Sequence, residues 1–199
     1  MNVLAENKPL FNIGKLMQTP PDRVPNKLVI GGLIALMFGV VGSAYILYYL
    51  GVFSNVSVKF EQSPEYRIAF VENTGPYNKI DSLLESVSKD LEANGITNAN
   101  AIAIFLDDPS VVEKRDLRSK VGYVISDFDQ PPHPLQVEVL QSQEVVQATF
   151  HGSPLVGSFK AYKAMKQWCA DNGYIPSLPG TEIYRNDGTV EYYLPIKKR

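Results

Sequence analysis

Few of the residues from which chemical sites are usually built occur in this chain of 199 residues. It contains one cysteine, Cys169, and two histidines, His133 and His151. A single cysteine excludes an internal disulfide, and two histidines are too few for a metal site unless several carboxylates join them. The chain also lacks a P-loop, a G-x-G-x-x-G turn, a G-x-S-x-G elbow and an HExxH helix. The sequence therefore predicts no metal and no cofactor, and Cys169 is interpreted as a small buried hydrophobe.

Positive charge is scarce as well. Residues 51–199 carry 15 Lys and Arg against 19 Asp and Glu, a net charge of −4. Proteins that bind nucleic acid through its phosphates carry clustered basic side chains. We therefore expect no nucleic-acid partner for this part of the chain.

One long uncharged segment is present near the N-terminus. Leu28 to Leu50 holds 23 residues without a charge, and as a helix this segment would be roughly 35 Å long, enough to cross a bilayer. The 27 residues before it, and the lack of a small-x-small cleavage site after it, argue against a signal peptide. The sequence predicts a single transmembrane helix, with the lipid bilayer as a partner, behind a polar and disordered tail of residues 1–27.

The charges that flank this segment indicate its direction in the membrane. Four basic residues lie in the 20 residues before the segment and two in the 20 after it: Lys8, Lys15, Arg23 and Lys27, against Lys59 and Arg67. Basic residues favour the cytoplasmic side. We expect the C-terminal domain on the non-cytoplasmic side, which in a bacterium is the periplasmic face of the inner membrane.

Behind a short linker, residues 51–55, one pattern occurs twice. The segments 75–95 and 152–173 each contain an amphipathic helix bracketed by glycines, with β-rich stretches before and after it. The inward residues are predicted as Ile80, Leu83, Leu84, Val87 and Leu91 in the first helix, and as Phe159, Tyr162, Met165 and Cys169 in the second.

This duplication predicts the fold class. The two repeats, about 56–126 and 135–197, each read strand–helix–strand–strand, and the strands within 135–152 are expected to pair with each other. Neither repeat can bury its apolar face alone, so the two should form one α+β domain over residues 56–197 with a cleft between the repeats.

Acidic and aromatic residues alternate on the closing strands of the second repeat. Glu182 and Tyr184 share one strand face, Glu191 and Tyr193 share another, and Tyr123 occupies the corresponding strand of the first repeat. A carboxylate beside tyrosines in a cleft would attract an organic cation or polarise an electrophile. The same pattern also fits solvated positions on an open sheet, and the sequence alone leaves both interpretations open.

Several segments in a fixed order resemble a known family. They are AIAIFLDDPSVVEKRDLRSKVGYVIS, VVQATFHGS, the helix that holds Trp168, and EIYRNDGTVEYYLPI. Over roughly residues 56–197 the chain resembles the gyrase-inhibitor-like small-molecule-binding domain. That resemblance implies the tandem strand–helix–strand–strand fold, and relatives include the effector domains of multidrug-sensing transcription activators. No helix-turn-helix accompanies the domain here, so the transcriptional role is not carried over.

The membrane segment adds a finer resemblance. With VVQATF and EIY, the layout is similar to the membrane-anchored branch that includes the testis-expressed reticulophagy receptor. This chain departs from that receptor because it stops at Arg199, without the long disordered tail that holds an autophagy-protein-binding motif. The aromatic-x-x-aliphatic segment Tyr193 to Ile196 lies in a predicted strand. A protein-binding adaptor is therefore kept as an alternative function.

The family resemblance also implies a site. It matches the acidic pocket residue to Glu191, and the pocket aromatics to Trp168 and Tyr123. Some family members resemble hydrolases of reactive cyclopropane-bearing compounds. If this chain acted in that way, Glu191 would be the general base and Tyr123 the proton donor. We predict a membrane-anchored binding protein for a small hydrophobic or cationic molecule. A hydrolase of electrophilic compounds is the second alternative.

Overall fold

The computed structural model of this protein describes residues 26–199. The predicted polar tail, residues 1–27, lies outside this range except for its last two residues. Three of the four basic residues that indicate the direction of the helix also lie outside it: Lys8, Lys15 and Arg23. The chain divides between Tyr45 and Ile46 into two units.

The first unit, where described, is the larger part of helix α1 (Asn26–Tyr49). Its apolar side chains are exposed along the whole helix, and none is buried. In the described part of the chain, α1 is the one helix long and apolar enough to be a candidate membrane span. Its bounds differ by one or two residues from the predicted segment, Leu28 to Leu50.

The second unit is an α+β domain, as predicted. Its helices are the single 3-10 turn η2 (Tyr77–Lys79), α2 (Ile80–Ala93) and α3 (Pro154–Asn172). Its strands are β1 (Ser57–Gln62), β2 (Tyr66–Thr74), β3 (Ala101–Phe105), β4 (Arg118–Val124), β5 (Gln136–Leu140), β6 (Glu144–His151), β7 (Tyr174–Pro176), β8 (Gly180–Tyr184) and β9 (Thr189–Lys198). They form one antiparallel sheet in the order β1-β6-β9-β8-β3-β4-β2-β5, and β7 pairs with the end of β9.

The predicted duplication is visible in the order of the elements. The series β2-α2-β3-β4 is followed by β6-α3-β8-β9, and the two meet where β3 pairs with β8. The strand that precedes each series crosses to the other repeat, since β1 pairs with β6 and β5 pairs with β2. The expectation that the strands within 135–152 pair with each other is therefore wrong. Periodicity identifies strands but does not identify their partners.

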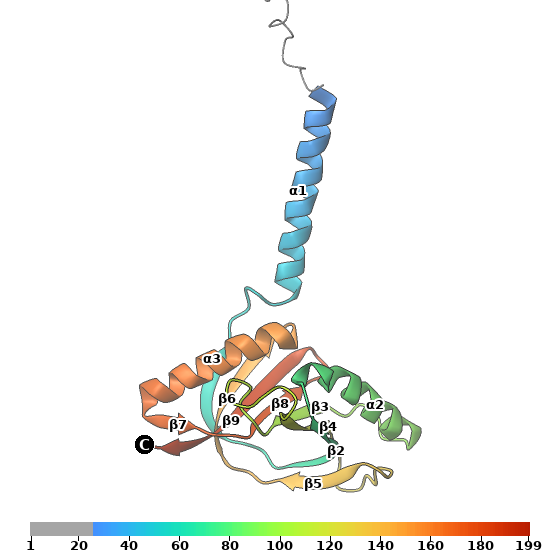
Figure 1. Ribbon diagram of the computed structural model, residues 1–199, viewed down its shortest axis with the longest axis vertical. Helices are drawn as coiled ribbons and strands as arrows, with labels where there is room; N and C mark the ends of the chain where they lie inside the picture. The colour runs from blue at the N-terminus through green and yellow to red at the C-terminus, as the bar shows by residue number, and fades with distance from the viewer. Residues whose placement is uncertain (1–25) are drawn as a thin grey trace, which may run out of the picture. The chain divides into compact units, whose positions relative to one another are not determined.

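Two cores lie on opposite faces of the sheet. Helices α2 and α3 cover the same face (Figure 1), where Met165 and Cys169 of α3 pack on Ala148 and Tyr192. On the other face, residues 26–199 place no helix, and the core there is formed by side chains of both repeats: Ile68, Phe70, Ile102, Ile104, Val145, Ile183 and Tyr193. Because both faces are apolar, strand alternation alone does not tell which face a given residue occupies.

Helix α3 ends where predicted, at Gly173, but its inward face differs from the prediction. Met165 and Cys169 are fully buried, whereas Phe159 is 77% exposed. The buried stripe instead begins with small residues, Gly157 and Ala161. A side chain on Gly157 would lie 2.2 Å from the Tyr192 hydroxyl, so the helix approaches the sheet too closely there for a ring.

Candidate functional site

The two predicted acid–tyrosine pairs lie on opposite faces of the sheet. In the pairing of β8 with β9, Glu182 stands opposite Tyr192 and Ile183 stands opposite Glu191. Opposed residues in an antiparallel pair point to the same face. Since Tyr192 packs under α3, Glu182 and Tyr184 lie on the helix-covered face, and Glu191 and Tyr193 lie on the other. Each pair shares a face as predicted, but the four residues do not form one site.

Glu182 is a buried acid whose partners are hydroxyl groups. It is 3% exposed. The Tyr184 hydroxyl donates a hydrogen bond to Oε2 at 2.9 Å, and Ser158 Oγ of α3 lies 3.1 and 3.2 Å from the two carboxylate oxygens. In residues 26–199, no lysine, arginine or histidine nitrogen lies within 4.0 Å of this carboxylate. The carboxylate therefore sits in a dry environment without a countercharge.

Burial sets the protonation of this group. Loss of water raises the pKa of Glu182 to about 7, although hydrogen bonds from Tyr184 and Ser158 act in the opposite direction. The same burial, together with the neighbouring Glu182, raises the pKa of Tyr184 and keeps that phenol protonated. At neutral pH the acid is thus divided between its neutral and its charged form.

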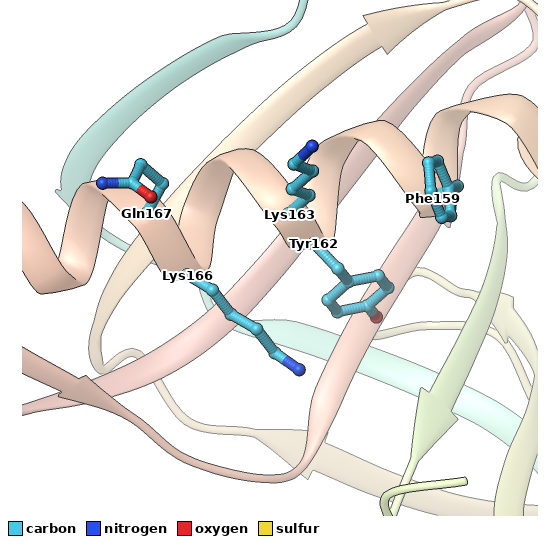
Figure 2. Close-up of a pocket in the computed structure, with 5 residues that line it drawn as sticks. All are labelled: Phe159, Tyr162, Lys163, Lys166 and Gln167. Atoms are coloured by element: carbon cyan, nitrogen blue, oxygen red, sulfur yellow. The ribbon is translucent and has the colours of Figure 1, made fainter. Parts of the chain in front are cut away.

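Tyr162 connects this acid to a hollow on the domain surface. Its hydroxyl is buried near Glu182 and has no hydrogen-bond partner in the described part of the chain. Its ring borders a hollow of about 480 Å³, together with four other side chains of α3: Phe159, Lys163, Lys166 and Gln167. Figure 2 shows Tyr162 and Lys166 directed to one side of the helix and Lys163 to another. A ligand in this hollow would contact Tyr162, whose hydroxyl is the link to Glu182.

Glu191, which the family resemblance favoured, is already paired. Arg185 donates to Oε2 at 2.6 Å, and the Tyr193 hydroxyl donates to the same oxygen at 2.8 Å. Gln147 Nε2 donates a hydrogen bond to the Tyr193 hydroxyl at 3.1 Å. The Tyr66 hydroxyl lies 3.4 Å from the same Tyr193 hydroxyl. The carboxylate is neutralised within the protein, so this cluster is better suited to holding the sheet than to receiving a cation.

The remaining two predicted residues do not join either acid. Tyr123 lies under α2 and donates a hydrogen bond to the Leu84 carbonyl at 3.2 Å. It stands opposite Ala101 on β3, on the helix-covered face. Trp168 stacks on Tyr174, with ring centroids 5.7 Å apart. Because Tyr123 and Glu191 are on opposite faces of the sheet, the predicted base and proton donor of a hydrolase are not brought together.

Ser158 and the polar role of Tyr162 were not predicted from the sequence. These residues are four apart on α3 and therefore lie on the same side of the helix. A hydroxyl pair at this spacing beside a predicted inward face was the available signal. Within residues 26–199, no group of three or more His, Cys, Asp or Glu could hold a metal ion.

Part of this chain is similar in sequence to a known protein. The SPbeta prophage-derived protein YosT of Bacillus subtilis (strain 168), named as a transcriptional regulator, is 34% identical over 85 residues. That match covers 41% of this chain and 57% of YosT, so the chain spans little more than half the length of this relative.

Solved structures resemble the domain at low sequence identity. The C-terminal domain of EcmrR has a TM-score of 0.59 at 17% identity, covering 72% of this chain and 99% of that one. EcmrR in a complex with DNA has a TM-score of 0.59 at 15% identity, covering 95% and 78%. SAV2435, solved with bound tetraphenylphosphonium, has a TM-score of 0.51 at 13% identity, covering 71% and 94%.

These structures share the fold, and the family itself is identified by the sequence match. Residues 57–197, nearly the whole of the second unit, match the family described as the GyrI-like small-molecule-binding domain. The family resemblance derived from the ordered motifs is therefore confirmed. This chain belongs to the GyrI-like small-molecule-binding domain family.

Proposed function

We propose that this protein is a membrane-anchored receptor for apolar small molecules that carry a positive charge, and that Glu182 recognises the charge. The observation that carries the proposal is a buried carboxylate without a countercharge in the described residues, close to Tyr162, whose side chain borders a hollow on α3. Glu182 replaces Glu191 as the acidic residue of the proposed site, because Arg185 already neutralises Glu191.

The free energy of the buried acid favours a cationic ligand. An ionised carboxylate is unfavourable in a dry site unless a positive charge is near it. In the ligand-free protein the acid responds by holding its proton, which is why its pKa rises to about 7. A bound cation would stabilise the charged form and displace that proton. The ligand would thus supply the partner that the protein lacks.

The walls of the hollow fit the apolar part of such a molecule. Phe159 and Tyr162 present ring faces, which attract both hydrocarbon and cationic groups. Lys163 and Lys166 also border the hollow, and both side chains are exposed to solvent. Exposed lysines are screened by salt, whereas Glu182 is not. Tetraphenylphosphonium, found bound to SAV2435, is an apolar cation and therefore a suitable first probe.

Membrane anchoring is the second part of the proposal. Helix α1 has the length and apolar composition of a span. We place the domain on the non-cytoplasmic side, following the excess of basic residues before the helix. The further resemblance to reticulophagy receptors remains a prediction. That this chain has no nucleic-acid partner also remains a prediction. The prediction fits poorly with the structural similarity to EcmrR, which was solved bound to DNA.

The test is calorimetric binding of tetraphenylphosphonium to the full chain in phosphatidylcholine nanodiscs. We expect saturable binding that Glu182→Gln abolishes. Glu191→Gln is the matched control and should retain binding, because it makes the same change on the opposite face. The affinity should rise about tenfold per pH unit below pH 7 and level off above it, since binding releases one proton. Equal affinity in the Glu182→Gln variant would overturn the proposed site.

A hydrolase is the second candidate, supported by one observation. A carboxylate with a pKa of about 7 beside a protonated tyrosine is suited to general base catalysis, with Glu182 activating water and Tyr184 donating a proton. Incubation with an electrophilic cyclopropane should then give a product with added water. Binding of such a compound without any turnover would exclude this function.

A further inference from the structure

The chain that follows the apolar helix is held against the start of α3. The Ser153 amide donates a hydrogen bond to the Leu50 carbonyl at 3.1 Å. Gly51 has φ 75° and Gly152 has φ 144°, and a Cβ on either would lie within 3.0 Å of backbone atoms across the crossing. Only glycine allows two backbone segments to cross this closely with positive φ. The end of the apolar segment is thus fixed beside the first turn of α3.

A second contact extends this attachment along the helix. Lys160 donates hydrogen bonds from Nζ to the carbonyls of Val52, at 2.9 Å, and Ser54. Residues 50–54 therefore run beside the N-terminal half of α3. They cannot move away from α3 without breaking these contacts.

The outward face of α3 has the composition of a membrane-surface helix. Leu155 is 84% exposed and Phe159 is 77% exposed. Two exposed lysines follow, Lys163 and Lys166, and the first acidic residue of the helix is Asp171. A helix that presents Leu, Phe and Lys without acids is typical of contact with anionic lipid. The remainder of the domain is acidic, so this face is opposite in sign to its surroundings.

We infer that the outward face of α3, which we call the α3 face (Leu155, Phe159, Lys163 and Lys166), rests on the surface of the membrane that holds α1. The inference depends on the anchoring proposed above. If the apolar segment spans the bilayer and ends at Leu50, then Ser153 lies one hydrogen bond from a residue at the membrane surface. The first turn of α3 must then lie at that surface, where Leu155 can insert among the lipid chains and the lysines can meet headgroups.

This arrangement specifies the source of the ligand. Phe159, Lys163 and Lys166 belong both to the α3 face and to the wall of the hollow that Tyr162 borders. A hollow bordered by a membrane-bound helix opens at the lipid surface. The ligand would then be an amphiphilic cation already dissolved in the bilayer, because such molecules concentrate at the headgroup level.

The test places a fluorophore on the α3 face of the full chain. Leu155→Cys is labelled with an environment-sensitive dye in nanodiscs of phosphatidylcholine and phosphatidylglycerol, with or without nitroxide-labelled lipid. Phe128→Cys is the control, since Phe128 is an equally exposed apolar residue, 93% exposed, in the loop between β4 and β5. Cys169 is buried and should take up no dye in the unsubstituted chain. We expect a blue shift and loss of fluorescence by nitroxide at position 155 only.

Two further measurements separate this inference from the proposed anchoring. Extraction of the chain from liposomes by alkaline carbonate would overturn the anchoring, and with it the inference. A chain that resists extraction but shows no quenching at position 155 would overturn the inference alone. The double variant Lys163→Glu, Lys166→Glu should reduce the quenching in anionic nanodiscs, and quenching unaffected by this change would overturn the role of charge.

Discussion

Glu182 and Glu191 carry the same side chain on neighbouring strands but have different surroundings. Glu182 is buried under α3 among hydroxyl groups, whereas Arg185 pairs with Glu191. The difference follows from the two faces of the sheet, because α2 and α3 cover the face that holds Glu182. A buried carboxylate without a cationic partner is uncommon and affects the stability of the fold.

The buried acid should make the stability of the protein depend on pH. The folded chain holds the Glu182 proton with a pKa of about 7, against 4.5 for an unperturbed glutamate. The folded state therefore binds more protons than the unfolded state between these values. The contribution of this group to stability is greatest below pH 4.5 and is lost as pH rises through 7, by about 3 kcal/mol in total.

Glu182→Gln should remove this dependence. We expect the variant to match the wild-type protein near pH 4.5 and to exceed it in unfolding free energy at pH 8, measured by urea denaturation. Glu191→Gln serves as control because it makes the same change on the opposite face of the sheet. An equal pH profile in the wild-type and Glu182→Gln proteins would contradict the buried-acid interpretation.

At the scale of elements, the positions of both helices and the inward face of α2 were predictable, whereas the inward face of α3 was predicted only in part. Helix α3 begins at Pro154 and ends before Gly173 as the sequence indicated. Its inward face was assigned from large apolar residues and therefore included Phe159. The structure packs Gly157 and Ala161 against the sheet instead. Small residues at a close contact give no apolar signal, so periodicity overlooks them.

The close contact at Gly157 predicts that alanine at this position lowers the stability of the protein, whereas helix propensity alone predicts a gain. Alanine is about 1 kcal/mol more favourable than glycine inside a helix. In this protein the added methyl would meet Tyr192 Oη at 2.2 Å and Phe150 Cδ1 at 2.7 Å. We expect Gly157→Ala to lower the free energy of unfolding by about 1–3 kcal/mol.

Urea denaturation followed by circular dichroism measures this change. Lys163→Ala on the exposed face of the same helix is the control and should alter the stability by less than about 0.5 kcal/mol. A Gly157→Ala variant more stable than the wild type would show that α3 does not pack as described.

At the scale of the whole molecule, the two repeats form a single folding unit. Each contributes a leading strand to the sheet of the other, and β3 and β8 pair across the boundary between them. The core on the helix-free face combines Ile68 and Ile102 of the first repeat with Val145 and Ile183 of the second. The α+β class and the two repeats followed from periodicity. The exchange of strands could not be predicted, because it depends on long-range pairing.

Damage to one repeat should therefore unfold the other. Leu91 of α2 is 2% exposed in the first repeat, and Trp168, the only tryptophan, lies in the second. Leu91→Ala should lower the unfolding free energy by about 2–5 kcal/mol. We expect Trp168 fluorescence and circular dichroism to show this loss with coincident transitions. A Trp168 transition that stays at the wild-type urea concentration would show that the repeats unfold independently.

The exchanged strands also fix an order of events during synthesis. Strand β1 leaves the ribosome early, yet its partner β6 is made much later, and β9, which lies between β6 and β8, is the last strand of the sheet to emerge. The sheet cannot close until residue 198 is free. Helix α1 is made before any of these strands. With α1 anchored as proposed, the polypeptide behind it must reach its final compartment unfolded, and the GyrI-like domain must assemble there after its last strand arrives.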